Sequence, residues 1–150
     1  MNRIILFAAL IILASCDPKR VYENTIDLNQ GYWHADSAFT FQIPVEEEGD
    51  FRLYMDIRNT SAYEYYNLYI NYSLKKDGAM ISTQMKELIL FDPKTGKPKG
   101  SGLGDIVDSR LPLVDSLHLL PGIHEFKVLQ NMRKDSLMEL RSVGVRLERL

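Results

Sequence analysis

The sequence predicts an all-β protein, an antiparallel β-sandwich of about seven or eight strands in a jelly-roll or immunoglobulin-like arrangement. Several segments alternate apolar and polar residues with a period of two, which is typical of strands with one buried face. Glycine, proline and Asp-Gly turn signals separate these segments. Only residues 131–141 have loosely helical spacing, so at most a short helix is expected there. A barrel that encloses a ligand-binding lumen is the alternative.

Four strands are expected in the first half of the domain, over residues 39–45, 51–58, 66–74 and 80–91. Pro44 predicts that the first of them lies at a sheet edge or ends there, because proline has no N–H to donate to a ladder. The third and fourth are separated by Asp77-Gly78, which favours a tight turn and therefore a hairpin.

The second half begins with a long exposed loop over residues 92–104. This segment holds two prolines and four glycines in thirteen residues, which is too many for a regular element, and we expect its glycines to adopt positive φ. Three further strands are expected over residues 111–120, 124–128 and 143–147, with a turn at Pro121-Gly122.

The amino terminus has the form of an export signal. Asn2-Arg3 gives a short positive start, and Ile4 to Leu13 is an apolar run of ten residues. As a helix this run rises about 15 Å, half of the ~30 Å hydrocarbon core, which indicates a signal peptide over residues 1–15 and not a membrane span. The sequence Leu-Ala-Ser-Cys that follows resembles a bacterial lipobox, which implies that Cys16 becomes the first residue of the mature chain and is acylated. The alternative is an ordinary secretory signal with an unmodified cysteine.

The expected domains are therefore a signal peptide, an acylated Cys16 with a flexible tether over residues 16–30, and a sandwich over residues 31–150. The tether is polar and without a period, and at ~3.3–3.6 Å per residue it would lift the domain roughly 40–50 Å from the lipid. Because two or more acyl chains anchor a protein stably, a lipid bilayer is an expected partner. We expect the domain to lie in the cell envelope and face the periplasm, with the choice between inner and outer membrane left open.

Charge and cysteine content exclude several functions. Without Arg3 the chain has 17 basic and 20 acidic side chains, a net charge of −3, so no nucleic-acid partner is expected. One cysteine excludes intrachain disulfides and cysteine-based zinc sites. Serine-hydrolase and zinc-protease motifs are absent from the sequence, and His118 and His124 are expected to hydrogen-bond loops instead of binding a metal. We therefore expect a protein that is not an enzyme and has no metal site or cofactor.

Tyrosines are concentrated in one part of the chain, with six of the eight between Tyr54 and Tyr72. Exposed aromatic rings stack on sugars or form the centres of protein interfaces. Candidate binding residues are Trp33, Tyr63, Tyr65 and Tyr66. The alternative is that these rings line one end of the sandwich and hydrogen-bond locally.

The order of several short motifs resembles a known family. The motifs are the lipobox, Tyr32-Trp33, Arg58-Asn59-Thr60, Tyr63-x-Tyr65-x-Asn67-Leu68, Gly100 to Ile106 with the downstream Asp108-x-Arg110, and Met132-Arg133. Together they resemble the gliding motility lipoprotein family GldH of the Bacteroidetes over nearly the whole chain. The resemblance implies an envelope lipoprotein needed for surface gliding, a process tied to type IX secretion, and it carries over no catalytic residue.

Two hypotheses for function follow. The first is a non-catalytic lipoprotein that binds other envelope proteins of the gliding or secretion apparatus. The alternative is a glycan-binding lipoprotein that uses the aromatic cluster as a stacking platform. Three Asp-Ser-apolar triplets also resemble the O-glycosylation sequence of exported Bacteroidetes proteins, which implies candidate sites at Ser37, Ser116 and Ser136.

Overall fold

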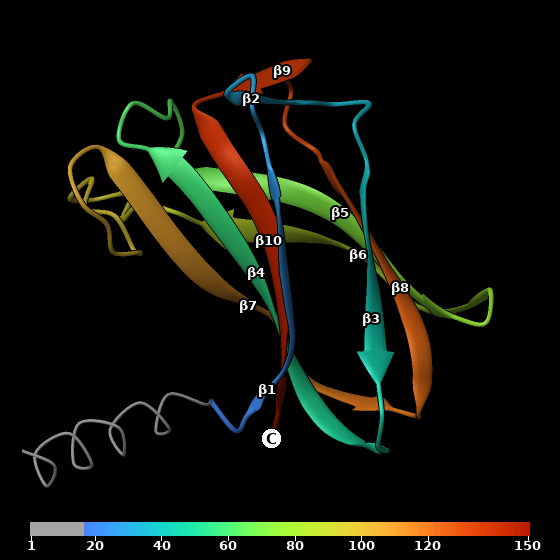
Figure 1. The fold of residues 1–150 in the computed structure, drawn as a ribbon. Coiled ribbons are helices and arrows are strands. Elements are labelled where there is room, and N and C mark those ends of the chain that lie inside the picture. The colour runs from blue at the N-terminus through green and yellow to red at the C-terminus, as the bar shows by residue number, and fades with distance from the viewer. Residues whose placement is uncertain (1–16) are drawn as a thin grey trace, which may run out of the picture.

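The fold is a two-layer β-sandwich, seen here in a computed structural model that describes residues 17–150. The predicted signal peptide and Cys16 lie outside the described residues. Two four-stranded antiparallel sheets face each other across the core (Figure 1). The predicted sandwich is thus confirmed, and the barrel alternative is not adopted.

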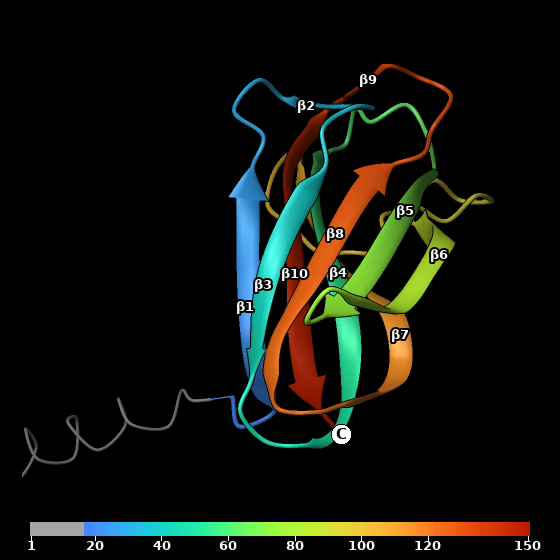
Figure 2. The same ribbon diagram turned by 90° about the vertical axis from the view of Figure 1, so that its right-hand side faces the viewer.

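Each sheet combines strands from distant parts of the chain. Sheet I has the order β1 (Arg20–Asp27), β10 (Leu140–Arg149), β4 (Gly49–Thr60) and β7 (Ile106–Leu119). Sheet II has the order β3 (Phe39–Val45), β8 (Gly122–Gln130), β5 (Asn67–Lys76) and β6 (Ala79–Ile89). A short pair, β2 (Tyr32–His34) and β9 (Ser136–Met138), lies across one end of the sandwich (Figure 2).

The alternation seen in the sequence corresponds to burial between the sheets. In β4, Phe51, Leu53, Met55 and Ile57 are buried, whereas the side chains between them are partly or fully exposed. The central strand β10 differs because Ser142, Gly144 and Arg146 on its outer face are buried too. The core therefore fills the space between the sheets, and the outer face of sheet I has buried positions of its own.

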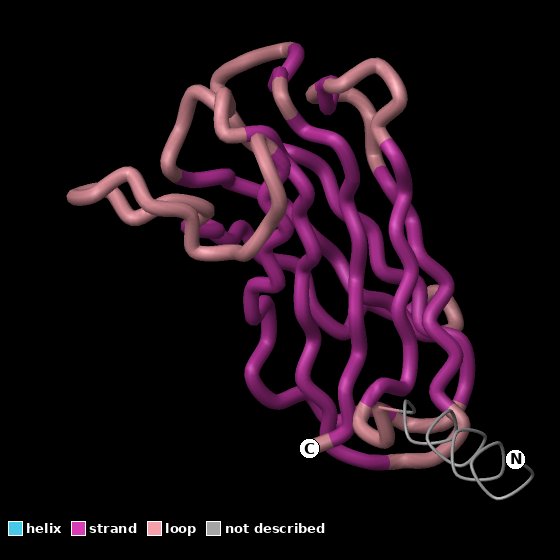
Figure 3. Tube along the Cα trace, turned by 60° about the vertical axis from the view of Figure 1, so that its left-hand side comes forward, coloured by secondary structure: helices cyan, strands magenta, loops and turns pink. Residues whose placement is uncertain are grey.

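Several predicted elements are confirmed. β5 and β6 form the expected hairpin, and positive φ at Asp77 and Gly78 fits a tight two-residue turn. Pro44 lies in β3, an edge strand of sheet II. Residues 92–105 form an irregular loop at the end of the molecule opposite the C-terminus, where most long loops gather (Figure 3).

Three expectations differ from the structure. The expected tether over residues 16–30 is wrong for Arg20–Asp27, because this segment is strand β1 and pairs with β10. The segment 131–141 contains no helix, because β9 occupies part of it and the positive φ of Glu139 interrupts any helical turn. β7 is longer than the short strand expected, and irregular register between β4 and β7 accommodates Pro112.

Candidate functional site

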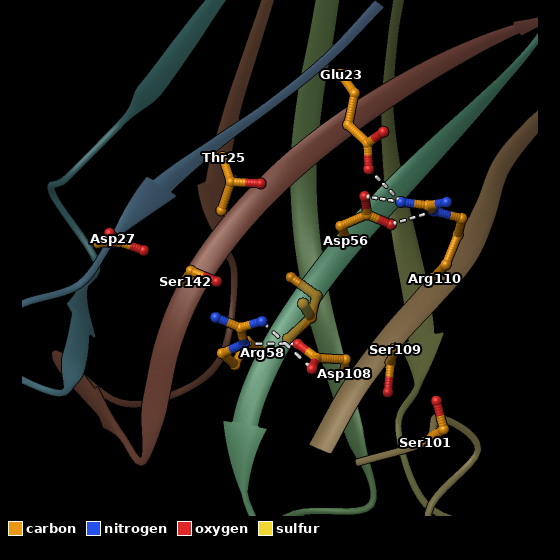
Figure 4. Close-up of a pocket in the computed structure, with 11 residues that line it drawn as sticks. Glu23, Thr25, Asp27, Asp56, Arg58, Ser101, Asp108, Ser109, Arg110 and Ser142 are labelled. Carbon is orange, nitrogen blue, oxygen red and sulfur yellow. Dashed lines mark hydrogen bonds and ion pairs between the residues drawn. The ribbon is translucent and has the colours of Figure 1, made fainter. Parts of the chain in front are cut away.

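A polar groove of about 550 Å³ lies on the outer face of sheet I (Figure 4). All four strands of this sheet and the loop before β7 contribute to it. Its lining residues are Glu23, Thr25, Asp27, Asp56, Ile57, Arg58, Ser101, Asp108, Ser109, Arg110 and Ser142. The groove thus contains four carboxylates, two guanidinium groups and four hydroxyls.

One wall is built from two Asp-x-Arg sequences on neighbouring strands. Antiparallel register places Asp56 of β4 opposite Arg110 of β7, and Arg58 opposite Asp108. Arg58 donates from Nε to Asp108 Oδ1 at 2.6 Å, and Arg110 donates from Nε and Nη2 to the Asp56 carboxylate at 2.8 Å each. Because residues i and i+2 share a face of a strand, each sequence presents its acid and its base to the groove together.

A buried arginine connects this wall to β1. Arg146 on β10 donates from Nη1 to Glu23 Oε2 at 2.9 Å and from Nε to Glu148 at 2.6 Å, and it also contacts Asp17. The other carboxylate oxygen of Glu23 accepts from Arg110 at 2.5 Å. Glu23 therefore bridges two arginines and fixes the position of β1 along one side of the groove.

The floor is formed by small residues of β10. A Cβ added at Gly144 would lie 2.6 Å from Thr25 Oγ1 and 2.9 Å from the Asn24 carbonyl oxygen, distances that real Cβ atoms do not show. Ser142 lies two residues before it and is buried. The hollow therefore exists because β10 places only Ser142 and Gly144 between β1 and β4 at this point.

The loop before β7 closes one end of the groove. Ser101 and Asp108 exchange backbone hydrogen bonds of 3.0 and 2.7 Å. A Cβ at Gly100 would lie 2.1 Å from the Asp108 carbonyl oxygen, so this glycine is required for close approach and not, as expected, for a positive φ. Gly104 does have a positive φ, as expected.

Ion pairs favour the charged forms of Arg58, Arg110 and Glu23. The hydrogen bond with Asp108 raises the pKa of Arg58, and the hydrogen bond with Asp56 raises that of Arg110. Burial raises the pKa of Glu23, but Arg20, Arg110 and Arg146 outweigh it and lower the pKa overall. The groove thus offers hydroxyls and charged side chains that ion pairs hold in place.

Among residues 17–150 no three histidine, cysteine or acidic side chains are grouped so as to hold a metal ion. In the same part of the chain there is no helix with the length and apolar character needed to cross a membrane.

The predicted aromatic platform is wrong for Trp33 and Tyr63. Both side chains are buried in the core. Trp33 donates from Nε1 to the Ser37 carbonyl oxygen at 2.7 Å, and the Tyr63 hydroxyl donates to the Asn67 carbonyl oxygen at 3.0 Å. Their polar atoms satisfy the backbone while their rings fill the core, which is the local role considered as the alternative.

The two remaining tyrosines of the cluster are not fully buried. Tyr66 is exposed, and Tyr65 is half-buried with its ring edge-to-face against that of Tyr63, 5.8 Å between centroids. Tyr65 and Tyr69 line a separate hollow with Met85 and Met132 on the far side of the sandwich from the groove.

The candidate glycosylation serines differ in accessibility. Ser116 is exposed on the edge strand β7, whereas Ser136 in β9 and Ser37 just after β2 are half-buried. Modification at these sites stays a prediction.

The histidines are separated in the structure. His118 is exposed, and its Nδ1 and Nε2 lie 2.8 Å from Asp50 and 3.1 Å from Glu48. His124 is buried at the start of β8.

Arg58, Asp108 and Arg110 stand out in the sequence only as motif residues, and the structure brings all three into the groove. Asp56, Glu23 and Arg146 were missed. The repeated Asp-x-Arg pattern at 56–58 and 108–110 is the signal that would have predicted the paired wall.

Comparison with known proteins agrees with the resemblance seen in the sequence. The family model described as GldH lipoprotein matches residues 20–147. The chain is 29% identical to a gliding motility lipoprotein GldH homolog of Christiangramia forsetii, over 93% of this chain and 90% of that protein. It is 27% identical to the gliding motility lipoprotein GldH of Flavobacterium johnsoniae, over 98% and 96% of the two chains.

Solved structures are more distant. A family 35 carbohydrate binding module from Clostridium thermocellum aligns with a TM-score of 0.47 at 11% identity, covering 88% of this chain and 93% of that one. The relatives by sequence are named as lipoproteins of gliding motility and not as enzymes. Since the family model spans both sheets, from the first residue of β1 almost to the end of β10, the chain belongs to the GldH lipoprotein family.

Proposed function

We propose that this chain is a non-catalytic lipoprotein, acylated at Cys16, that binds a partner protein of the gliding or type IX secretion assembly. Its sandwich faces the periplasm. Family membership and the names of the sequence relatives support the assignment to gliding motility. The lipobox-like sequence before Cys16 supports the anchor.

The groove on sheet I is the partner site of this proposal. The observation that carries it is a sheet face that no other element of residues 17–150 covers and whose charged side chains are already held in place by one another. Binding to such a surface loses little side-chain entropy, because the rotamers are fixed before the partner arrives. The four carboxylates of the groove are opposed by its two guanidinium groups and by Arg146, which pairs with Glu23, and the one carboxylate in excess favours a partner segment that presents a basic side chain.

A pull-down from native membranes tests this function, with Thr25→Lys as the groove variant. Thr25 is exposed on β1 and lines the groove, so a lysine there fills the hollow and repels a basic partner. Asn71→Lys is the matched control, because Asn71 is exposed on β5 in the opposite sheet.

The native chain and Asn71→Lys are expected to retain a gliding or secretion protein that Thr25→Lys loses. All three chains must show the same membrane association and thermal stability. Recovery of no such protein with the native chain, in cells that express the apparatus, would refute the proposed function. Equal recovery of the partner with Thr25→Lys and Asn71→Lys would show that the groove is not the partner site.

A further inference from the structure

The residues that follow Cys16 are part of the folded domain. Arg149 N donates to the Lys19 carbonyl oxygen at 2.8 Å, and Arg20 N donates to that of Asp17 at 3.2 Å. The Asp17 carboxylate contacts the buried guanidinium of Arg146. The chain is thus held on sheet I from Asp17 onward, where a free tether was expected.

The peptide bond places the proposed anchor next to this point. Consecutive Cα atoms are about 3.8 Å apart, so the Cα of Cys16 lies within that distance of the Asp17 Cα. Acyl chains on Cys16 would therefore enter a bilayer beside the domain and not roughly 40–50 Å below it.

Several segments share the end of the sandwich at which β1 begins. Arg20 pairs with Glu148 near the end of β10, and Leu150 N donates to the Asp50 carbonyl oxygen at 3.0 Å. Gly49 pairs with Leu119, just before the β7–β8 turn. Figures 1 and 2 both place the start of β1, the C-terminus and the β3–β4 and β7–β8 connections at one end. We call this end, made of residues 17–19, 46–49, 120–123 and 150, the anchor end.

Large apolar side chains are exposed at the anchor end. Leu120 is 50% exposed, Ile123 54% and Leu150 57%. The first two flank Pro121-Gly122 in the β7–β8 turn. Such side chains gain by entering the interface of a bilayer that the anchor already holds close.

The charges at the anchor end have both signs. Lys19 lies there with Asp17 and the acidic turn 46–48, and Arg20, Asp50 and Arg149 lie directly beside it in the strands. Arg149 pairs with Glu47, and His118 with Glu48. This surface is not polybasic, so its approach to lipid would depend on the anchor and the apolar turn instead of on anionic headgroups.

We propose that the anchor end lies against the lipid bilayer, so that the strands of sheet I rise from it and the groove opens to the side, above the lipid. The proposal rests on the proposed acylation of Cys16. Arg58 lies nine residues beyond Gly49 along β4, which corresponds to roughly 30 Å at ~3.3 Å per residue. The groove is therefore held at a fixed height above the lipid, where a periplasmic partner reaches it.

Depth-dependent fluorescence quenching of the acylated chain tests this orientation. Cys16 is the only cysteine, and acylation uses its thiol, so an introduced cysteine is the only free thiol for labelling. Leu120→Cys and Ile123→Cys report on the anchor end. Leu103→Cys and Met138→Cys are matched controls, because they replace exposed apolar residues in the 92–105 loop and in β9, at the opposite end.

Each chain is labelled with an environment-sensitive dye and reconstituted into phosphatidylcholine vesicles that contain nitroxide-labelled lipids. Quenching and a blue shift are expected at 120 and 123 and not at 103 and 138, with no change as salt is raised. Equal quenching at all four positions, or stronger quenching at 103 and 138, would overturn the orientation.

Failure of the anchor gives a different result. A chain that incorporates no labelled fatty acid and stays in the aqueous phase after detergent phase separation is not acylated, which would overturn both the orientation and the proposed lipoprotein function. An acylated chain in vesicles with the wrong quenching pattern would overturn the orientation alone.

Discussion

Replacing Arg146 with methionine tests the ion pairs that hold β1 against the groove. The Arg146 side chain is 7% exposed and contacts the carboxylates of Asp17, Glu23 and Glu148. Methionine preserves most of the apolar stem, so the variant removes mainly the charge. It would leave Glu23 and Glu148, 28% and 19% exposed, without this counter-ion.

The structure sets how much stability Arg146→Met is expected to lose. Removing one partner of a fully buried ion pair costs about 3–5 kcal/mol. Because Glu23 and Glu148 are partly hydrated and Glu23 keeps Arg110, we expect the lower end, about 3 kcal/mol, which corresponds to a fall of about 10 °C in Tm.

Urea unfolding followed by tryptophan fluorescence measures this change. Trp33 is the only tryptophan and is fully buried, so its emission reports on the core. Arg52→Met is the control, because Arg52 is 40% exposed and lies 3.7 Å from Asp115, an exposed pair that contributes less than about 1 kcal/mol. A loss for Arg146→Met below about 1 kcal/mol, or equal to that of Arg52→Met, would refute the reasoning.

The difference in stability between the native protein and Arg146→Met is expected to depend on pH. Burial raises the pKa of Glu23, but its arginine partners lower it overall, so folding favours the charged form. The stabilisation is present above the ordinary pKa of about 4.3 and is lost as the pH falls through the lowered value. The difference in free energy of unfolding between the native protein and Arg146→Met should therefore become smaller below about pH 4.

Three further predictions follow from the same structure. Burial lowers the pKa of His124, so this residue should make the native protein less stable as the pH drops below about 6.5. In His124→Leu the free energy of unfolding in urea should therefore change less between pH 7 and 5, and the same pH dependence in both proteins would contradict this. Gly144→Ala should cost about 1–3 kcal/mol in urea unfolding, because its Cβ would overlap Thr25 and the backbone of β1; a neutral result would refute the account of the groove floor. Arg58→Asp should lower the free energy of unfolding by about 1 kcal/mol, because it places two carboxylates opposite each other, and adding Asp108→Arg should restore most of that loss. A double-mutant cycle with no coupling between positions 58 and 108 would contradict this.

Some strands were predictable because their inner faces are apolar. β4 buries Phe51, Leu53, Met55 and Ile57 on one face, so its period of two is visible in the sequence. β1 was missed because it is an edge strand whose outer residues, Glu23 and Thr25, face the groove. Its polarity reflects cross-strand partners that no local pattern reveals.

The site was less predictable than the fold. Its wall requires the register that pairs Asp56 with Arg110, and register is decided by the whole sheet. The aromatic residues were misleading for a related reason. Tyr63 has a polar hydroxyl and an apolar ring, so a tyrosine at this position is compatible with both a surface and a core. Packing between the sheets determines that it is buried.

Site-specific photocrosslinking in living cells tests most directly whether the groove is the partner site. A benzophenone amino acid is placed at Thr25 in the groove or at Asn71 on the opposite sheet, both exposed positions on strands. We predict that a gliding or secretion protein is crosslinked from position 25 and not from position 71. Crosslinking of the same protein from position 71 alone, or of none from position 25 in cells that carry the apparatus, would contradict the account.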